Sequence, residues 1–427
     1  MIRTALVFQL FLVLLLCRVT ALGQDTQNVP DEPVILLKGL IRDAATGEAI
    51  PLATISLTVN GITTISNDNG LFVFKVPTAD GHDSMYISHV GYQSLVLPLD
   101  GWSALPAADT GARLITLRST AIQLPVVTVR PPDPLALIDS AIARIPDNYP
   151  SRPFVLTGFY RLDGIYKKRI ISLSEALFTI YSPDNQRRNM QFRLIRGRTD
   201  RDESAFDGKD FSVGPTPDNL MDRDMISRIH QTQILGDNGR DDHHFSYGGL
   251  IDYEGRTAFE IRFDQKDDVR RSLYKGRIII DTANLAFLCF DYGLSPKGLP
   301  YRGRGQGPGH AVSTGNTLVI RYRRYGAKYY LDQVHTVVHL HLYDDGNPSV
   351  KRDTLMTRLN YLVTRIDTGM VAFSRVGKKV DDRVMIAQQA PVNKGKKDDD
   401  YWVGYNSIAA DYDVDSALAA IRKSGKK

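Results

Sequence analysis

Runs of β-forming residues separated by turn residues follow one another along most of the chain, and this pattern points to a mainly β fold. Between residues 34 and 129, glycine, asparagine and aspartate mark the turns, and no convincing helix interrupts the runs. Seven short strands at this spacing predict an antiparallel β-sandwich over residues 30–130. The seven runs are Val34–Arg42, Leu52–Thr58, Leu71–Val76, Ser84–Val90, Gln93–Leu99, Arg113–Leu117 and Leu124–Val129.

Residues 151–427 predict a second, larger β-rich domain. Several of its runs are long and alternate apolar with polar residues, which favours a large antiparallel sheet with one apolar and one polar face. Helices are expected around Asp218–Ile229 and, at the C-terminal end, around Val414–Arg422. The predicted strands are Phe154–Leu162, Lys168–Tyr181, Gln191–Ile195, Ala258–Asp264, Gly276–Asp281, Phe287–Tyr292, Thr317–Tyr325, Lys328–Tyr343 and Thr354–Ile366.

A proline-rich joint and a change of charge separate the two parts. Asp133 and Pro134 suit the cap and the first position of a helix, so residues 131–150 are expected to form a linker and a helix that ends at Pro146. The apolar face of this helix repeats at Leu135, Ile138, Ile142 and Ile145. Residues 24–126 hold 10 acids and 5 bases, whereas residues 127–427 carry a net charge of +8.

The first 23 residues have the pattern of a secretory signal peptide. Arg3 provides the positive charge, Ala5–Cys17 the apolar stretch, and Ala21-Leu22-Gly23 a cleavage site before Gln24. The apolar stretch is too short to span ~30 Å of hydrocarbon, so we expect a mature chain without a transmembrane helix. Lipid attachment at Cys17 is the alternative, disfavoured by the bulky leucine before it. The pattern predicts export across the inner membrane, to the periplasm or the outer membrane surface.

Four short segments of the N-terminal part resemble the carboxypeptidase regulatory-like domain. They are Lys38–Asp43, Thr46–Ile55, Thr63–Ser66 together with Asp68–Phe72, and His89–Tyr92. The resemblance implies a transthyretin-like Greek-key sandwich, a non-catalytic module. Asp68, Asn69 and Gly70 themselves predict a turn in which the glycine takes a positive φ.

Motifs in the rest of the chain are similar to those of one group of envelope proteins, the carboxypeptidase-like regulatory domain-containing proteins of Bacteroidetes-type bacteria. They are DPLALIDSAIARIPDNYP (133–150), LTGFYR (156–161), SLSEALFTIY (172–181), LIRGR (194–198) and WVGYNSI (402–408). This resemblance implies a non-enzymatic envelope protein whose second half is a curved antiparallel sheet like that of periplasmic lipoprotein carriers. The motifs contain no evident chemistry.

Known catalytic patterns are missing from the sequence. None of the nine histidines begins a His-x-x-Glu pair, which excludes the usual zinc peptidase, and Gly-x-Ser-x-Gly is absent. The glycine-rich run Tyr301–Gly309 lacks the Lys-Ser/Thr of a phosphate loop and predicts a flexible loop. A net charge of +5 over 427 residues is too sparse for a nucleic-acid binder. Cys289 lies among apolar residues and is expected to be an inert buried thiol.

The weak candidate for a metal site is a histidine trio on one strand. His335, His339 and His341 share parity, so their side chains should project from the same face. No carboxylate or cysteine completes the set, and we assign no metal, cofactor or catalytic residue. His243-His244 is interpreted as loop. Basic clusters such as Arg321-Tyr322-Arg323-Arg324 could face an anionic ligand, but a solvated sheet face with acids supplied from elsewhere, such as Asp200, Asp202 and Glu203, is favoured.

These observations predict a secreted, non-catalytic envelope protein that binds an unidentified envelope protein, glycan or amphiphile. The alternative is a metal-dependent hydrolase centred on the histidine strand.

Overall fold

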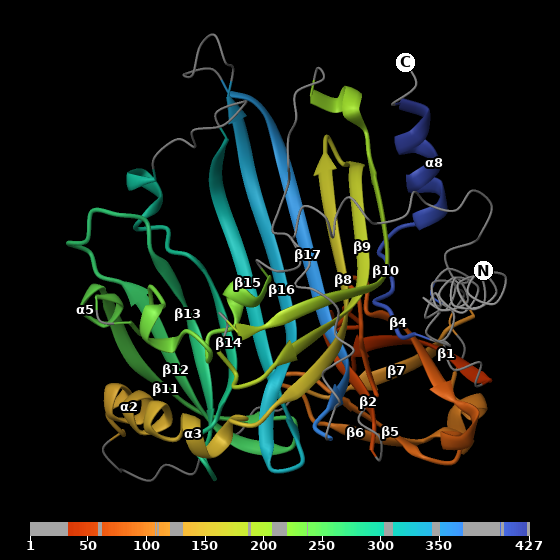
Figure 1. Ribbon diagram of the computed structural model, residues 1–427, viewed down its shortest axis with the longest axis horizontal. Coiled ribbons are helices and arrows are strands. Elements are labelled where there is room, and N and C mark those ends of the chain that lie inside the picture. The colour runs from red at the N-terminus through yellow and green to blue at the C-terminus, as the bar shows by residue number, and fades with distance from the viewer. Residues whose placement is uncertain are drawn as a thin grey trace, which may run out of the picture.

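The computed structural model describes residues 33–58, 62–106, 108, 111–119, 131–186, 189–206, 220–236, 238–302, 311–343, 351–369, 402 and 405–424. Most of the regular structure in these residues is strand, which confirms the mainly β fold (Figure 1). The signal sequence, Cys17, the run Leu124–Val129 and the glycines of the 301–309 loop lie outside the described residues. No helix within the described part of the chain is long and apolar enough to cross a membrane.

The N-terminal part is a sandwich of two small sheets, with strand orders β4-β1-β7 and β3-β2-β5-β6. Its core includes Phe72, Phe74, Ile55 and Ile87, which are all fully buried. Six predicted strands match, and the three-residue β3 was too short to be recognised. The strands are β1 (Val34–Asp43), β2 (Thr54–Leu57), β3 (Thr63–Ile65), β4 (Leu71–Pro77), β5 (Ser84–Ser88), β6 (Leu95–Pro98) and β7 (Arg113–Leu117), with 3-10 turns at Thr78–Asp80 and Leu99–Ala104.

One strand pair in this sandwich corrects the expectation of a purely antiparallel arrangement. Strand β7 lies parallel to β1, with Gly39–Asp43 opposite Arg113–Leu117. A parallel pair requires a crossover between sheets, and the 3-10 turn Leu99–Ala104 with the residues after it makes this crossover from β6. The sequence pattern gives strand length but not strand direction.

The joint continues into two short helices. In α2 (Pro134–Ala143) the Asp133 side chain accepts a hydrogen bond from the Leu135 backbone N–H at 2.9 Å, as expected for an N-cap. Ile138 and Ala141 are buried, whereas Leu135 is 39% exposed and does not belong to the buried face. Pro146 does not end this helix. Arg144 ends it, and Pro146 lies in the first turn of α3 (Ile145–Asn148), a position that suits proline.

The C-terminal part is built on one ten-stranded antiparallel sheet, in the order β10-β9-β8-β17-β16-β15-β14-β13-β12-β11. Figure 1 shows its long, curved strands in the middle of the molecule. The pair His243-His244 opens β11 rather than a loop, because the His243 ring packs with Phe245 and Phe263. The strands are β8 (Phe154–Tyr166), β9 (Arg169–Ser182), β10 (Gln191–Arg201), β11 (His243–Tyr253), β12 (Arg256–Gln265), β13 (Tyr274–Asp281), β14 (Phe287–Leu294), β15 (Val312–Tyr325), β16 (Lys328–Tyr343) and β17 (Lys351–Asp367).

The connection from β10 to β11 contains little regular structure. From Leu220 onward, the helix expected over Asp218–Ile229 is replaced by the 3-10 turns Met221–Arg223 and Ile229–Gln231. Asp224 between them is extended, and its carboxylate accepts a hydrogen bond from the Ile226 backbone N–H at 3.2 Å, which competes with helix formation. We call residues 220–236 the insert. Its other short elements are the 3-10 turn Glu203–Phe206 before it and α5 (Gly239–Asp242) after it.

Both faces of the large sheet are covered. Leu359, Tyr361 and Val363 of β17 point into the main core, which the insert and helices α2 and α3 share. Leu362 points the other way, into a cluster that includes Ile65 of the sandwich. The polar face expected for this sheet is therefore buried under the sandwich in its middle. The predicted C-terminal helix is α8 (Val414–Ser424), which packs beside β9 and β10 (Figure 1).

Candidate functional site

Four of the five motifs without evident chemistry meet in one buried place on the sandwich side of the sheet, whereas the motif at residues 133–150 packs on the other face. Glu175 of β9 is fully buried and accepts hydrogen bonds from Arg161 of β8, whose Nε lies 2.6 Å from Oε1, and from Nε of Arg198 of β10. Trp402 covers them, with its ring 5.1 Å from that of Phe159 and under the Arg198 guanidinium. Glu175, Arg198 and Trp402 each come from a different motif, and Phe159 and Arg161 both come from LTGFYR.

A third arginine extends this group toward the sandwich. Arg358 of β17 donates to Asp163 of β8 from Nε and Nη2, at 3.1 and 3.0 Å. Its Nη1 lies 2.5 Å from Asp68 of the sandwich and 2.5 Å from Asp411 of the C-terminal segment. The Tyr412 hydroxyl donates to Asp163 at 2.5 Å. We call Arg161, Asp163, Glu175, Arg198 and Arg358 the interface cluster.

The buried carboxylates of the interface cluster are each paired with arginine. Burial alone would raise the pKa of Glu175, but Arg161 and Arg198 outweigh burial and hold that pKa below its ordinary value. Burial raises the pKa of Asp163 in spite of Arg358. Each carboxylate has an arginine partner inside the cluster, so an ionic ligand would have to break an existing pair. The cluster therefore fixes the sandwich on the sheet rather than offering a binding site.

The C-terminal segment 405–412 is a strap between sandwich and sheet. The Asn406 side chain accepts from the Lys75 backbone N–H at 2.8 Å and donates to the Lys75 backbone carbonyl at 3.0 Å, so it pairs with the open edge of β4. Arg161 donates to the Ile408 carbonyl at 2.6 Å, and Asn67 to the Ala410 carbonyl at 2.9 Å. The WVGYNSI motif thus has a structural explanation.

The three candidate histidines share a face of β16, as predicted, but they do not form a site. His335 is buried, and its Nδ1 lies 2.7 Å from Oδ1 of Asn360, while burial lowers its pKa and keeps it neutral. His339 is exposed and lies opposite Met356, and His341 lies opposite Thr354. In the parts of the chain that the structure describes, no three His, Cys, Asp or Glu side chains are placed to hold a metal ion.

Several of the basic residues are paired with acids, but Arg198 and Arg321 are buried rather than on the solvated face that was expected. Arg323 pairs with Asp332 at 2.7 Å within the sheet. The acids named from the sequence also serve: Asp202 pairs with Arg169 and Asp200 with Arg422, both at 2.7 Å. Cys289 is buried, and burial raises the pKa of its thiol to about 12, so it is the inert thiol predicted from its neighbours.

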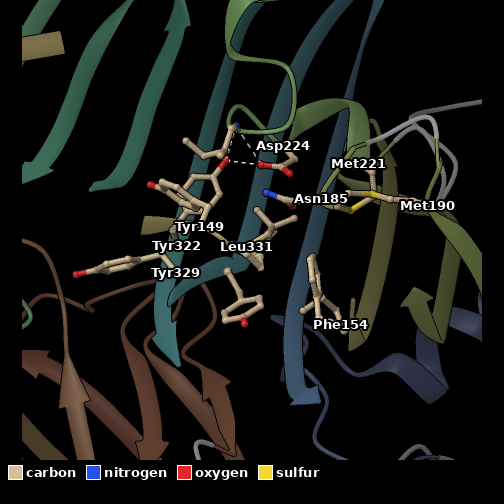
Figure 2. A pocket seen from close by; sticks show the side chains of 13 residues that line it. Tyr149, Phe154, Asn185, Met190, Met221, Asp224, Tyr322, Tyr329 and Leu331 are labelled. Atoms are coloured by element: carbon tan, nitrogen blue, oxygen red, sulfur yellow. Dashed lines mark hydrogen bonds between the residues drawn. The ribbon is translucent and has the colours of Figure 1, made fainter. Parts of the chain in front are cut away.

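A pocket lies on the opposite, apolar face of the sheet, where the insert meets α3 and strands β8, β15 and β16 (Figure 2). The space between its lining atoms, open solvent included, is about 270 Å³, but the free cavity has room for only about one water molecule. Tyrosines and methionines dominate its lining, and we call it the tyrosine pocket. The lining residues are Tyr149, Pro150, Phe154, Leu156, Asn185, Met190, Met221, Asp224, Ile226, Tyr322, Tyr329, Tyr330 and Leu331.

Asp224 is the charged residue of this lining. It is 4% exposed, and its Oδ1 accepts a hydrogen bond from the Tyr322 hydroxyl at 2.6 Å. Among the described residues no arginine, lysine or histidine forms an ion pair with it, and burial raises its pKa. A buried carboxyl beside aromatic rings is unlike the arginine-paired carboxylates of the interface cluster. The tyrosine pocket is therefore the better candidate for a ligand site.

No pattern in the sequence indicates this pocket. Its residues come from the segment after α3, from β8, β15 and β16, from the β9–β10 loop and from the insert, and only the fold brings them together. The helix predicted over Asp218–Ile229 also concealed Asp224, which would have been one more polar residue on a helix surface.

No family model matches the chain, and no curated protein matches it. Among solved structures, it is similar to an outer membrane lipoprotein-sorting protein domain from Vibrio parahaemolyticus, with 12% identity and a TM-score of 0.23 over 56% of this chain and 94% of the other. A LolA superfamily protein from Nitrosomonas europaea matches with 9% identity and a TM-score of 0.20, over 58% and 99%. A membrane-associated protein of unknown function from Bacteroides fragilis matches with 11% identity and a TM-score of 0.14, over 78% and 99%. Similarity at these TM-scores assigns neither family nor function.

Proposed function

We propose that this chain is a secreted, non-catalytic envelope protein that binds an amphiphilic ligand in the tyrosine pocket, between the insert and the apolar face of the large sheet. The observation that carries the proposal is the pocket itself. Its walls are aromatic and methionine side chains with a single buried carboxyl, the mixture of apolar surface and few polar groups that is typical of small-molecule sites.

The insert is the element that would have to move to admit such a ligand. In this conformation the pocket has free space for about one water molecule, far less than the ~300–1,000 Å³ of ordinary ligand sites, so a ligand fits only after the insert is displaced. The insert consists of one-turn elements, and its apolar side chains lie on the sheet core. The insert has few regular backbone hydrogen bonds, but it buries seven apolar side chains, so a ligand must replace those contacts when the insert moves. Methionine adapts to new neighbours. The apolar residues that it contributes are Leu220, Met221, Met225, Ile226, Ile229, Ile234 and Leu235.

The hydrolase alternative has less support. It would need metal ligands around His335, but that ring is held by Asn360, and His339 is exposed. The envelope location rests on the signal-peptide pattern and the family resemblance of the sequence, and both stay predictions.

Binding of decanol to the mature full-length chain, measured by isothermal titration calorimetry, tests the proposal. Met221→Phe should narrow the pocket and weaken decanol binding several-fold. Met356→Phe is the matched control, because Met356 lies on the opposite face of the sheet, beside His339. Equal affinity in both variants would place the ligand elsewhere. No binding of decanol to the folded wild-type chain would refute the proposal and favour a protein or glycan partner.

A further inference from the structure

The geometry points to a protonated amine as the head group of the ligand, bound between the Asp224 carboxylate and the tyrosine rings of the pocket. This inference rests on the proposed function and names the chemical class of ligand for the same site. It follows from one unusual feature: the pocket holds a buried carboxyl whose polar neighbours are all neutral.

Asp224 is fixed in place with its charge uncompensated. The Tyr322 hydroxyl at 2.6 Å and the Ile226 backbone N–H at 3.2 Å hold Oδ1, and Asp224 has no ion pair within the part of the chain that the structure describes. A buried carboxylate is costly to desolvate without a cation or several hydrogen bonds. In the interface cluster, by contrast, the buried Glu175 receives two arginines. The cation that Asp224 lacks is the group that a ligand would supply.

The aromatic lining suits a cation as well. The Tyr149 ring lies 5.7 Å from the Tyr322 ring and 6.2 Å from the Tyr329 ring. Two of the tyrosine hydroxyls donate hydrogen bonds outside the pocket, Tyr149 to the Phe287 carbonyl at 2.7 Å and Tyr329 to Asp281 at 3.1 Å. The rings of these tyrosines, rather than their hydroxyls, therefore line the pocket. Figure 2 shows Asp224 beside Tyr322 on the insert side of this group. The electron-rich faces of tyrosines attract ammonium groups, most strongly where water is excluded.

The rest of the pocket provides for the apolar part of the ligand. Met190, Met221 and Phe154 lie on the side of the pocket away from Tyr149 (Figure 2). An alkyl chain attached to the amine would lie against these side chains in place of the insert residues. A fatty acid would instead bring its carboxylate toward Asp224, and the two negative charges would repel.

Three ligands with the same alkyl chain separate the outcomes: decylamine, decanol and decanoic acid, each titrated calorimetrically into the mature full-length protein at neutral pH below its micelle concentration. We expect decylamine to bind about tenfold or more tightly than decanol, and decanoic acid most weakly. Asp224→Asn keeps the hydrogen bond from Tyr322 and should abolish the preference for the amine while decanol binding persists. Tyr322→Phe controls for loss of that hydrogen bond and should keep the preference.

The possible results distinguish this inference from the proposed function. Equal binding of decylamine and decanol, or an amine preference that survives Asp224→Asn, refutes the amine assignment and leaves the amphiphile site standing. Failure of all three ligands to bind the folded wild-type chain refutes both. If Asp224→Asn does not fold, the order of the three wild-type affinities still decides, because an acid that binds as well as the amine overturns the inference.

Discussion

Replacing Arg358 by methionine should destabilise the protein more than almost any other single change on the sandwich side of the sheet. Arg358 lies between three carboxylates, and its loss affects them unequally. Asp163 is fully buried and would keep only the Tyr412 hydroxyl and the neighbouring charge of Arg161. The Asp68 side chain is 47% exposed and can return to water, so its separation costs little. Removing one partner of a buried pair costs about 3–5 kcal/mol, and the stranded Asp163 accounts for most of this figure.

Trp402 offers a local measure of this change, because its ring lies in the interface beside Phe159. Trp102, in the sandwich, is the other of the two tryptophans and can be replaced by phenylalanine to leave a single fluorophore. Urea unfolding followed by Trp402 emission and by far-ultraviolet circular dichroism then compares Arg358→Met with Arg324→Met. Arg324 is exposed near the end of β15 and provides the matched control.

The double variant Arg358→Met/Asp163→Asn tests the assigned cause. Removing the stranded carboxylate should recover a large part of the loss, since two missing partners cost less than one unpaired charge. If Arg358→Met differs from Arg324→Met by less than about 1 kcal/mol, the cluster does not hold the sandwich on the sheet and the reasoning fails.

Three other predictions follow from single residues. Gly70 has a φ of +77°, and a Cβ there would lie 2.4 Å from the Ile41 carbonyl oxygen. Gly70→Val should therefore lower the free energy of unfolding, measured in urea, by about 1–3 kcal/mol or more. Gly47→Ala should lower it less, because Gly47 has a φ of +72° but open space around it. Cys289 should not react with a thiol reagent at pH 8 until urea unfolds the chain, and rapid labelling of the native protein would contradict its burial. The pKa of Glu175 is lower in the folded protein than its ordinary 4.5, so its contribution to stability is complete above pH 4.5 and is lost as the pH falls further. Glu175→Gln should remove this part of the loss of stability in acid. An unchanged dependence of stability on acid pH in that variant would argue against this role of Glu175.

The strands of the large sheet could be predicted well because they are long and alternate regularly. The predicted run Lys328–Tyr343 is β16 residue for residue, and Arg113–Leu117 is β7. Failures occurred where a side chain satisfied the backbone in an unexpected way. The Asp224 carboxylate accepts a hydrogen bond from the Ile226 N–H, and 3-10 turns form where a helix was predicted. Strand β11 was overlooked because His243-His244 has no hydrophobic pattern, although in the fold the His243 ring packs against Phe263.

The candidate site could not be predicted, for a different reason. Tyr149, Asp224 and Tyr322 lie far apart along the chain, with gaps of up to about a hundred residues, so no local pattern connects them. The histidine trio showed the opposite problem: its parity was correct, but parity says nothing about the side chains across the sheet, and Asn360 engages His335 from β17.

The motifs that make the sequence recognisable lie mainly where the sandwich joins the sheet, and they contribute only Tyr149, Pro150 and Leu156 to the proposed ligand pocket. Glu175, Arg198 and Trp402 lie on the sandwich side of the sheet, whereas Asp224 and Tyr322 lie on the face under the insert. A fully paired buried cluster tolerates few changes, because any one substitution leaves a charge unpaired. A pocket lined by tyrosines and methionines tolerates many. Resemblance carried by the cluster therefore indicates how the two parts are joined, and the ligand must be determined by binding experiments on the tyrosine pocket.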